Sequence, residues 1–369
     1  MLFPFLKPNL PEPDAWVGYL EEAYKQRYFS NFGPLATRLA GLMTKAYLQD
    51  GYNGVLCASN TAGLTASLQA LSLAGKKVAL PDFTFAATPQ AVFSAGAEPV
   101  VCDVDPGTWE LSAESLSAAF EKHPDIACVI HVRPFGLLRD IEPVRAICRD
   151  RGVPLVVDAA AGLGAPSDET RFGSPAGEIE VFSLHATKVF AIGEGGFIAA
   201  PEAMLKKIRA AMNFGFHTDR SYGEGQNAKL DEFRAAIGLA MLERMDEAVA
   251  GRRRHAEFYQ GVFARYAGLR VAERPGPTPW SNFPVVFDQE VTSGILGTFA
   301  DNGIEVKKYY WPGVLKGYKG GRKLHAMPVP NSEHLQDRCA CMPIYSDFFP
   351  ETGSLLEGRI ETAMGMIEA

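Results

Sequence analysis

The sequence predicts an α/β fold, with a large domain built on a mostly parallel sheet flanked by helices and a smaller C-terminal α+β domain. Short apolar runs alternate with helical patterns through the first half of the chain, an order typical of parallel sheets. A chain of 369 residues can bury one large and one smaller core. Proline, glycine and aromatic residues become frequent after Gly268. We therefore assign residues 1–249 to an N-terminal segment and the large domain, and residues 250–369 to the small domain.

Each element is predicted from its periodicity and its flanking residues. Apolar side chains recur at helical spacing in residues 13–28, and residues 30–34 break the pattern. Apolar runs too short for helices are predicted as buried strands. Strands are expected at 54–58, 77–81, 98–103, 126–131, 154–158, 197–200 and 285–287, and helices at 35–48, 64–73, 89–95, 113–122, 140–151, 204–214, 233–246 and 247–266, with a polar loop at 218–226.

Several chemically useful side chains come directly after predicted strands. They are Thr61, Phe85, Asp158 and Lys188. Ligands of open α/β sheets gather at the carboxyl ends of strands. We therefore expect a binding site at this edge of the sheet.

Lys188 ends a polar cluster after the apolar run that starts at Val181, and a glycine-rich turn and a second apolar run follow. The pattern predicts strand, loop, strand, with the lysine in the loop. Apolar neighbours would partly desolvate the amine, so that its neutral form is accessible near pH 7, as a Schiff-base nucleophile requires. On these residues alone, an exposed loop lysine is the simpler reading.

Two further positions keep alternatives open. The turn at residues 59–63 joins a strand to a helix, a geometry that presents backbone N–H groups to an anion, although a plain helix N-cap explains it equally well. Asp158 could cap a helix or pair with a buried cation. A metal is disfavoured there because no second acidic or histidine ligand lies nearby in the sequence.

Composition and charge exclude other classes of function. The net charge is −7, and the only basic cluster, at residues 252–254, is predicted to mark a solvated helix face, so nucleic acid is not an expected partner. No apolar stretch is long enough to span a bilayer, and the first residues lack the features of a signal peptide. The six scattered cysteines are expected to be reduced and structural, without a zinc site. We expect a cytoplasmic protein.

Taken together, the segments resemble the DegT/DnrJ/EryC1/StrS family of sugar aminotransferases, a branch of the fold-type I PLP enzymes. Order and spacing agree from about residue 30 to 245, with a looser likeness at Met342-Pro343-Ile344-Tyr345. The matching segments are Gly33-Pro34, residues 59–62, 81–88, 96–100, 103–106, 158–160, 182–188, 193–196 and 227–236.

The resemblance implies a role for each matched residue. Lys188 would bind pyridoxal phosphate (PLP) covalently and then move the proton between substrate and cofactor. Asp158 would pair with the pyridinium nitrogen, and Phe85 would stack on the ring. The backbone at Thr61 and Ala62, with Ser183, would hold the phosphate. Asn227 would reach the phosphate of a partner subunit, because members of this family build each site across a homodimer.

Other positions are matched less closely or depart from the family. His185 matches a position near the cofactor, but a buried structural histidine is an equal alternative. Ala161 stands where many members have a glutamine that bonds the phenolic oxygen of the cofactor. The turn has Asn60 where glycine is commoner, and the C-terminal substrate loop has no histidine before His325. The candidate substrate contacts are Arg252, Lys307, Tyr309 and Tyr310.

The implied function is transfer of an amino group, from glutamate or glutamine, to a keto-sugar that is most often nucleotide-linked. One alternative is a PLP-dependent aminotransferase or dehydratase that acts on a cyclitol or another non-nucleotide ring. Dehydratase relatives replace the lysine with histidine, so Lys188 counts against that chemistry. The other alternative is a PLP-fold regulatory protein without turnover, against which Lys188, Asp158, Ser183 and Asn227 together argue.

Overall fold

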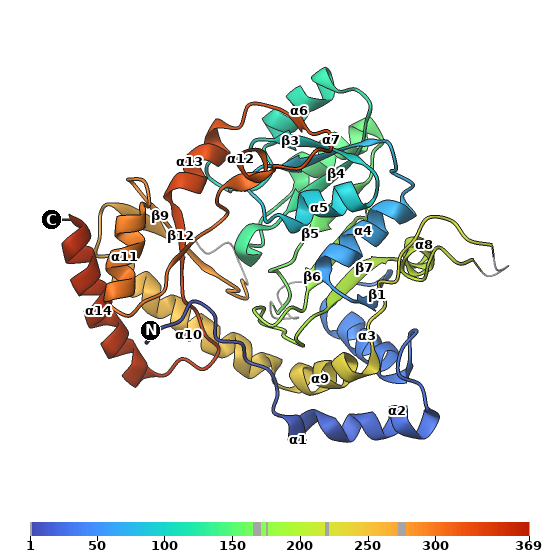
Figure 1. Ribbon diagram of the computed structural model, residues 1–369, viewed down its shortest axis with the longest axis horizontal. Coiled ribbons are helices and arrows are strands. Elements are labelled where there is room, and N and C mark those ends of the chain that lie inside the picture. Colours follow the sequence, from blue (N-terminus) through green and yellow to red (C-terminus); the bar gives the residue numbers. More distant parts are fainter. Residues whose placement is uncertain (1, 165–170, 175, 218–220, 272–277, 369) are drawn as a thin grey trace.

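Two β-sheets organise the chain in the computed structural model, which describes residues 2–164, 171–174, 176–217, 221–271 and 278–368 (Figure 1). The predicted loop at 218–226 and the proline-rich stretch after Gly268 therefore lie partly outside the described residues. Within those ranges the larger sheet has eight strands, in the spatial order β1 (Tyr52–Cys57), β7 (Gly196–Pro201), β6 (Ile179–Ser183), β5 (Leu155–Asp158), β4 (Ile126–Val132), β2 (Lys77–Pro81), β3 (Glu98–Cys102) and β11 (His325–Ala326).

The predicted α/β class and the mostly parallel sheet are confirmed. Strands β6, β5, β4, β2, β3 and β11 run parallel to their neighbours, whereas β7 runs antiparallel to both β6 and β1. The carboxyl ends of β1, β2, β4, β5 and β6 consequently meet at one edge. Strand β11 was not predicted, because a strand of two residues carries no periodicity.

Helices cover both faces of this sheet, which explains why its strands are apolar throughout. Leu155 and Val157 of β5 point into one hydrophobic cluster, and Val156 points into the other. The first cluster includes side chains of α3 (Pro34–Tyr47), α6 (Ala113–Lys122), α7 (Glu142–Arg151) and α9 (Glu232–Glu243), and the second those of α4 (Asn60–Ala70), α5 (Ala87–Ser94) and α8 (Glu202–Met212). The predicted helix at 13–28 is interrupted: α1 (Pro13–Trp16) and α2 (Leu20–Gln26) are separated by a 3-10 turn at Val17–Tyr19.

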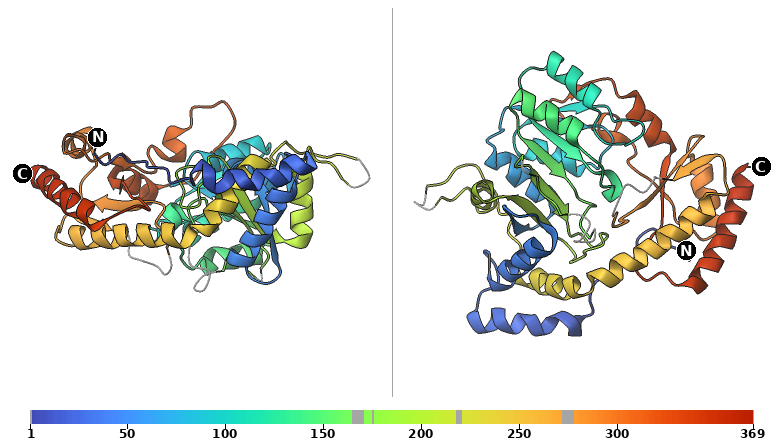
Figure 2. Two further views of the ribbon diagram at one scale, coloured as in Figure 1. Left: turned by 90° about the horizontal axis from the view of Figure 1, so that it is seen from below. Right: turned by 180° about the vertical axis from the view of Figure 1, so that it is seen from behind.

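The smaller sheet is antiparallel and lies beside the first (Figure 2). Its strands are β10 (Lys307–Lys308), β12 (Cys339–Met342), β9 (Phe283–Phe287) and β8 (Leu269–Val271), in that order. They pack with α10 (Met245–Phe263), α11 (Ser293–Asp301) and α14 (Pro350–Glu368) around a core of their own. The boundary predicted at residue 249 falls inside α10, and the division into domains stays a prediction.

A buried carboxylate fastens the C-terminal segments to the large sheet. Asp82 follows β2 and is 1% exposed. Its Oδ1 accepts from the backbone N–H of Leu315 (2.7 Å), and its Oδ2 accepts from Ser332 Oγ (2.7 Å) and from Gln336 Nε2. These donors belong to α12 (Gly313–Gly317) and α13 (Pro330–Arg338). The segment of the candidate residues Lys307, Tyr309 and Tyr310, in and directly after β10, is thereby held near the carboxyl edge.

The N-terminal segment connects the two sheets. Phe3 pairs with Ile304 next to the small sheet, and the Phe5 N–H donates to Glu305 Oε2 at 2.8 Å. The segment then reaches α1, which packs against α9 under the large sheet. Both ends of the described chain lie on the side of the small sheet (Figures 1 and 2).

The predictions about the cysteines, a metal site and membrane-spanning segments can be compared with the described residues. All six cysteines are free and buried, as predicted. Within the described ranges no group of three or more histidine, cysteine or acidic residues is arranged to hold a metal. No helix in those ranges combines the length and apolar character needed to cross a membrane.

Candidate active site

A cavity of about 460 Å³ opens at the carboxyl edge of the large sheet, between the two sheets. Its walls come from the ends of β1, β5 and β6, from the loop after β2, from the N-terminal segment and from the small sheet. It is lined by Phe5, Leu6, Lys7, Ser59, Asn60, Thr61, Thr84, Phe85, Ala87, Val132, Arg133, Asp158, Ala160, Ala161, Ser183, His185, Thr187, Lys188, Glu194, Arg252, Ser281, Asn282, Tyr309, Tyr310, Met342 and Ile344.

Asp158 lies in the floor of this cavity as the last residue of β5, 4% exposed. Its Oδ2 accepts from Thr88 Oγ1 (2.8 Å), and its Oδ1 accepts from Asn60 Nδ2 and the Ala160 N–H (both 3.3 Å). Burial raises the pKa of Asp158, and the three hydrogen bonds and the charge of Lys188 oppose that rise. A cationic partner in the cavity would stabilise the ionised form of this buried carboxylate.

The sequence reading missed both side chains that orient Asp158. The sequence alone identifies Asn60 only as a departure from the commoner glycine, yet its amide donates to Asp158 and also to the carbonyl oxygen of Val181 at 3.1 Å. Thr88 lay in a matched segment and was given no role. Residues 160–164 form a turn, so within this stretch Asp158 caps no helix.

Lys188 lies in the loop between β6 and β7, and the predicted strand–loop–strand arrangement is confirmed. The half-buried side chain contributes to the cavity wall. Burial, with a smaller contribution from the Arg252 charge, lowers the pKa of Lys188 to about 8 against the opposing effect of the Asp158 charge. The neutral amine is therefore available close to physiological pH.

The N-terminus of α4 faces the cavity beside Ser183. Ser59 is its N-cap and accepts from the Ala62 N–H at 3.2 Å, so the capping interpretation is correct, and Ala62 does not line the cavity. Thr61 and Ser183 do line it. A Cβ on Gly196 would stand 2.9 Å from the backbone nitrogen of Asn60, so glycine is needed for β7 to pass this close to the helix start.

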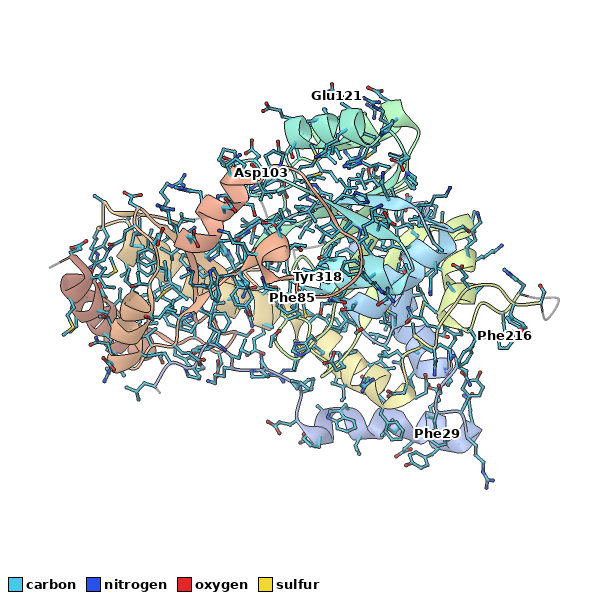
Figure 3. The ribbon with its side chains drawn as sticks, turned by 45° about the horizontal axis from the view of Figure 1, so that its top comes forward. Phe29, Phe85, Asp103, Glu121, Phe216 and Tyr318 are labelled. Carbon is cyan, nitrogen blue, oxygen red and sulfur yellow. The ribbon has the colours of Figure 1, made fainter. Side chains whose placement is uncertain are left out.

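Phe85 and His185 occupy the rim of the cavity. Phe85 is 59% exposed and points where a flat ring could stack on it. Figure 3 shows Phe85 near the centre of the molecule, close to Tyr318. His185 is not buried, because 43% of its side chain is exposed; its Nδ1 lies 2.9 Å from Thr187 Oγ1 and its Nε2 lies 3.5 Å from Glu194.

Asn227 lies away from the cavity. It is exposed and pairs with Asn213 at the base of the segment between α8 and α9. This segment projects from the edge of the large sheet (Figures 1 and 2), and Phe216 lies on the projection (Figure 3). Phe214, Phe216 and Tyr222 are 49%, 48% and 76% exposed there.

The candidate substrate residues divide between two cavities. Tyr309 and Tyr310 line the main cavity, whereas Lys307 lines only a second one, of about 590 Å³, that shares Thr84, Phe85 and both tyrosines with the first. Tyr310 stacks on Phe135 with ring centroids 5.1 Å apart. The second cavity is also lined by Lys308, Trp311, Tyr318 and Lys319.

The position of Arg252 contradicts the prediction that the basic cluster at residues 252–254 marks a solvated helix face. It is 4% exposed and lines the main cavity, whereas Arg254 of the same helix is exposed. The helical pattern alone could not distinguish the two, because the groups that bury Arg252 lie near residues 280 and 346.

The residues of the main cavity fit PLP. A desolvated amine and a buried carboxylate stand at Lys188 and Asp158, and a helix start with hydroxyls at Thr61 and Ser183 suits a phosphate. Phe85 provides an aromatic face. Four basic side chains (Lys7, Arg133, Lys188 and Arg252) line the cavity against two acidic ones (Asp158 and Glu194), which favours anionic ligands.

The comparisons with known proteins agree with this fit. The sequence model of the DegT/DnrJ/EryC1/StrS aminotransferase family matches residues 14–354. The chain is 30% identical to the UDP-N-acetyl-3-dehydro-alpha-D-glucosamine 3-aminotransferase of Acidithiobacillus ferrooxidans, over 89% of this chain and 86% of that one. It is 26% identical to the dTDP-4-amino-4,6-dideoxy-D-glucose transaminase of Shigella dysenteriae, over 96% of each. The crystal structure of DesI with its TDP-sugar product is similar with a TM-score of 0.85 at 29% identity, over 99% of this chain and 95% of that one.

The lowered pKa of Lys188 predicts how the cofactor-free protein captures PLP. Only the neutral amine reacts, and an ordinary lysine titrates near 10.4. Because burial brings the pKa of Lys188 to about 8, the capture rate should rise roughly tenfold per pH unit below that value and level off above it. Stopped-flow absorbance over pH 6 to about 10.5 measures the profile. Asp158→Asn, which removes a charge that raises this pKa, should move the midpoint down; a wild-type midpoint above about 10 would contradict the desolvated lysine.

Proposed function

Since this chain belongs to the DegT/DnrJ/EryC1/StrS aminotransferase family and is a PLP-dependent aminotransferase, we propose that it transfers an amino group from glutamate or glutamine to a nucleotide-linked keto-sugar in amino-sugar biosynthesis. The observation that carries the proposal is the main cavity itself, where Lys188 and Asp158 face one space that continues into a lysine-lined second cavity. The relatives named above act on UDP-, dTDP- and TDP-linked sugars, which supports the acceptor class.

Different residues of the chain would have different roles around the cofactor. Bound PLP would supply an electron sink for the electrons released at the substrate carbon. Asp158, ionised, would keep a proton on the ring nitrogen, and the hydrogen bonds from Thr88, Asn60 and the Ala160 N–H hold its carboxylate in place. Phe85 would cover one face of the ring.

Lys188 would serve in two roles at one atom. Its Nζ would first hold the cofactor covalently and, once a substrate amine replaces it, would accept and return the proton of the substrate carbon. A pKa of about 8 for the free amine suits both roles, because both its neutral and its protonated form are populated near neutral pH. Thr61 and Ser183 would hold the phosphate at the start of α4.

The second cavity is proposed to hold the nucleotide part of the acceptor. Three lysines line it, at 307, 308 and 319, and none of its lining residues is acidic. The Lys308 ammonium lies 5.3 Å above the ring of Trp311, whose side chain is 58% exposed. A diphosphate would meet the lysines, and a flat base has an aromatic surface on which to stack. Phe85, Tyr309 and Tyr310 lie where the two cavities join.

We also propose that each site is shared by two copies of the chain in a cytoplasmic homodimer. Asn227 lies outside its own cavity, on a projecting segment with exposed aromatic side chains, where it could reach a second copy. The six buried, unpaired cysteines suit a reducing compartment.

The reaction with an amino donor tests the proposed function. The purified protein should show the visible band of lysine-bound PLP, and L-glutamate or L-glutamine should convert it to the band of pyridoxamine phosphate. Lys188→Ala should lack the first band and the conversion, because no other amine holds the cofactor. An unchanged Lys188→Ala spectrum would show that another lysine carries it.

Asp158→Asn is the second variant in this experiment. The amide keeps the size of the side chain but cannot stabilise a protonated ring nitrogen, so conversion should slow by about a hundredfold or more while the cofactor stays bound. If Asp158→Asn lowers the stability by several kcal/mol and leaves conversion intact, Asp158 is structural only.

Binding of nucleoside diphosphates tests the second cavity. UDP, dTDP or GDP should bind the holoenzyme, and Lys308→Ala should weaken the best of them about tenfold through loss of one charge-assisted contact. Isothermal titration calorimetry measures the affinity. Lys316→Ala is the matched control, because Lys316 is exposed on α12 and does not line the cavity. Equal binding by both variants would place the nucleotide elsewhere.

Subunit mixing tests the shared site. If Asn227 completes the partner's site, Asn227→Ala should weaken cofactor binding. Mixing it with Lys188→Ala should then restore activity, because each hybrid dimer regains one site with both wild-type residues. Sedimentation should give twice the mass of the 40.0 kDa chain. A mixture no more active than its components would mean that Asn227 acts within its own subunit.

A further inference from the structure

Arg252 is a buried cation whose hydrogen-bond partners among the described residues are all neutral. Its Nε donates to Ser346 Oγ at 3.2 Å, and its Nη1 donates to the carbonyl oxygens of Trp280 and Ser281, both at 3.1 Å. Across the described ranges, no carboxylate lies within ion-pair distance of its guanidinium. The three contacts fix the plane of the group while leaving it part of the cavity wall.

The charge of Arg252 is therefore poorly neutralised. Burial lowers its pKa to about 10, against the opposing effect of the Asp347 charge. Asp347 itself is paired with Lys7, whose side chain also lines the cavity. Burying a guanidinium without a bonded carboxylate is costly, and an anion that enters the cavity would remove that cost.

The position of Arg252 selects among the anions that would enter. The proposed phosphate site lies at the start of α4 and the proposed diphosphate site in the second cavity, which Arg252 does not line. Arg252 instead belongs to the part of the wall that contains Ser281, close enough to Lys188 for its charge to lower the pKa of that lysine. An anion here lies near the reacting amine.

We propose that Arg252 binds the α-carboxylate of the amino-acid donor. This inference rests on the proposed function. In any α-amino acid the carboxylate is attached to the carbon that carries the amino group, so it must lie near Lys188 when the amine reacts. The three contacts use Nε and Nη1 and leave the N–H groups of Nη2 to donate to an oxygen of the carboxylate. A keto-sugar has no carboxylate at this place, so Arg252 distinguishes donor from acceptor within a single cavity.

A binding measurement tests the inference without requiring turnover. Glutarate, a dicarboxylate without an amine, is titrated calorimetrically into the holoenzyme. We expect binding by the wild type, a loss of about thirtyfold or more in Arg252→Met, and an intermediate loss in Arg252→Lys, which keeps the charge but not the contacts that fix the position of the guanidinium. Arg254→Met is the matched control, because Arg254 is exposed on the same helix. Equal affinity in Arg252→Met and Arg254→Met, or no binding by the wild type, would overturn the inference.

A second measurement separates carboxylate recognition from structural damage. The rate of cofactor conversion is compared for L-glutamate and 4-aminobutyrate, which lacks the α-carboxylate. The preference for glutamate should fall by about thirtyfold or more in the Arg252 variants, because conversion by 4-aminobutyrate should change much less. An equal loss for both amines would assign Arg252 to a structural role and overturn the inference.

The two proposals can fail separately. Arg252-dependent glutarate binding in a protein that neither glutamate nor glutamine converts would support the carboxylate site and contradict the proposed transamination. Conversion by glutamate that is insensitive to Arg252→Lys would support the transamination and contradict the carboxylate site.

Discussion

The removal of Asp158 and Lys188 from water is the constraint on which the rest of the site depends. Both side chains lie at the carboxyl edge of a sheet whose two faces are covered by helices. Water therefore does not reach either charge from the side of the sheet. Three hydrogen-bond donors stabilise the ionised carboxylate of Asp158, whereas none of comparable strength among the described residues stabilises the amine of Lys188. This imbalance leaves a lysine that readily loses its proton beside an aspartate that favours a cationic partner. The same edge brings a helix start and an aromatic face to the cavity.

The small sheet completes the site because its segments are fixed to the large one. Asp82 receives donors from α12 and α13, and this contact positions the loop that carries Tyr309 and Tyr310. Arg252 fixes the chain at Trp280 and Ser281 in the same way from α10. Ser281 Oγ in turn donates to the Ala161 carbonyl at 2.9 Å. Apart from the part-buried contact of Leu315, these polar contacts are buried, so a loosened contact would leave unsatisfied groups and not a solvated gap.

The sequence was informative wherever function follows from local pattern. The strand runs, the turn before α4 and the loop of Lys188 depend on neighbouring residues, and their positions after strands were enough to place them at one edge. Contacts between distant segments were not predictable. The burial of Arg252 depends on residues 280, 281 and 346, the pairing of β11 with β3 on a segment more than two hundred residues away, and the second cavity on the meeting of two loops. The role of Asn60 could not be predicted, because its hydrogen-bond partner, Asp158, is distant in the sequence.

The order in which the cavity wall is encoded has a consequence for biosynthesis. Phe5 and Lys7 lie on one wall, and Met342 and Ile344 contribute to it from the other end of the chain. Phe5 and Lys7 are therefore synthesised before Asp158 and Lys188, whereas Met342 and Ile344 are synthesised long after them. During that interval the wall lacks its later part, so the lysine is more exposed to water than in the finished chain. Selective capture of the cofactor is thus a property of the finished chain, acquired only after translation has passed residue 344.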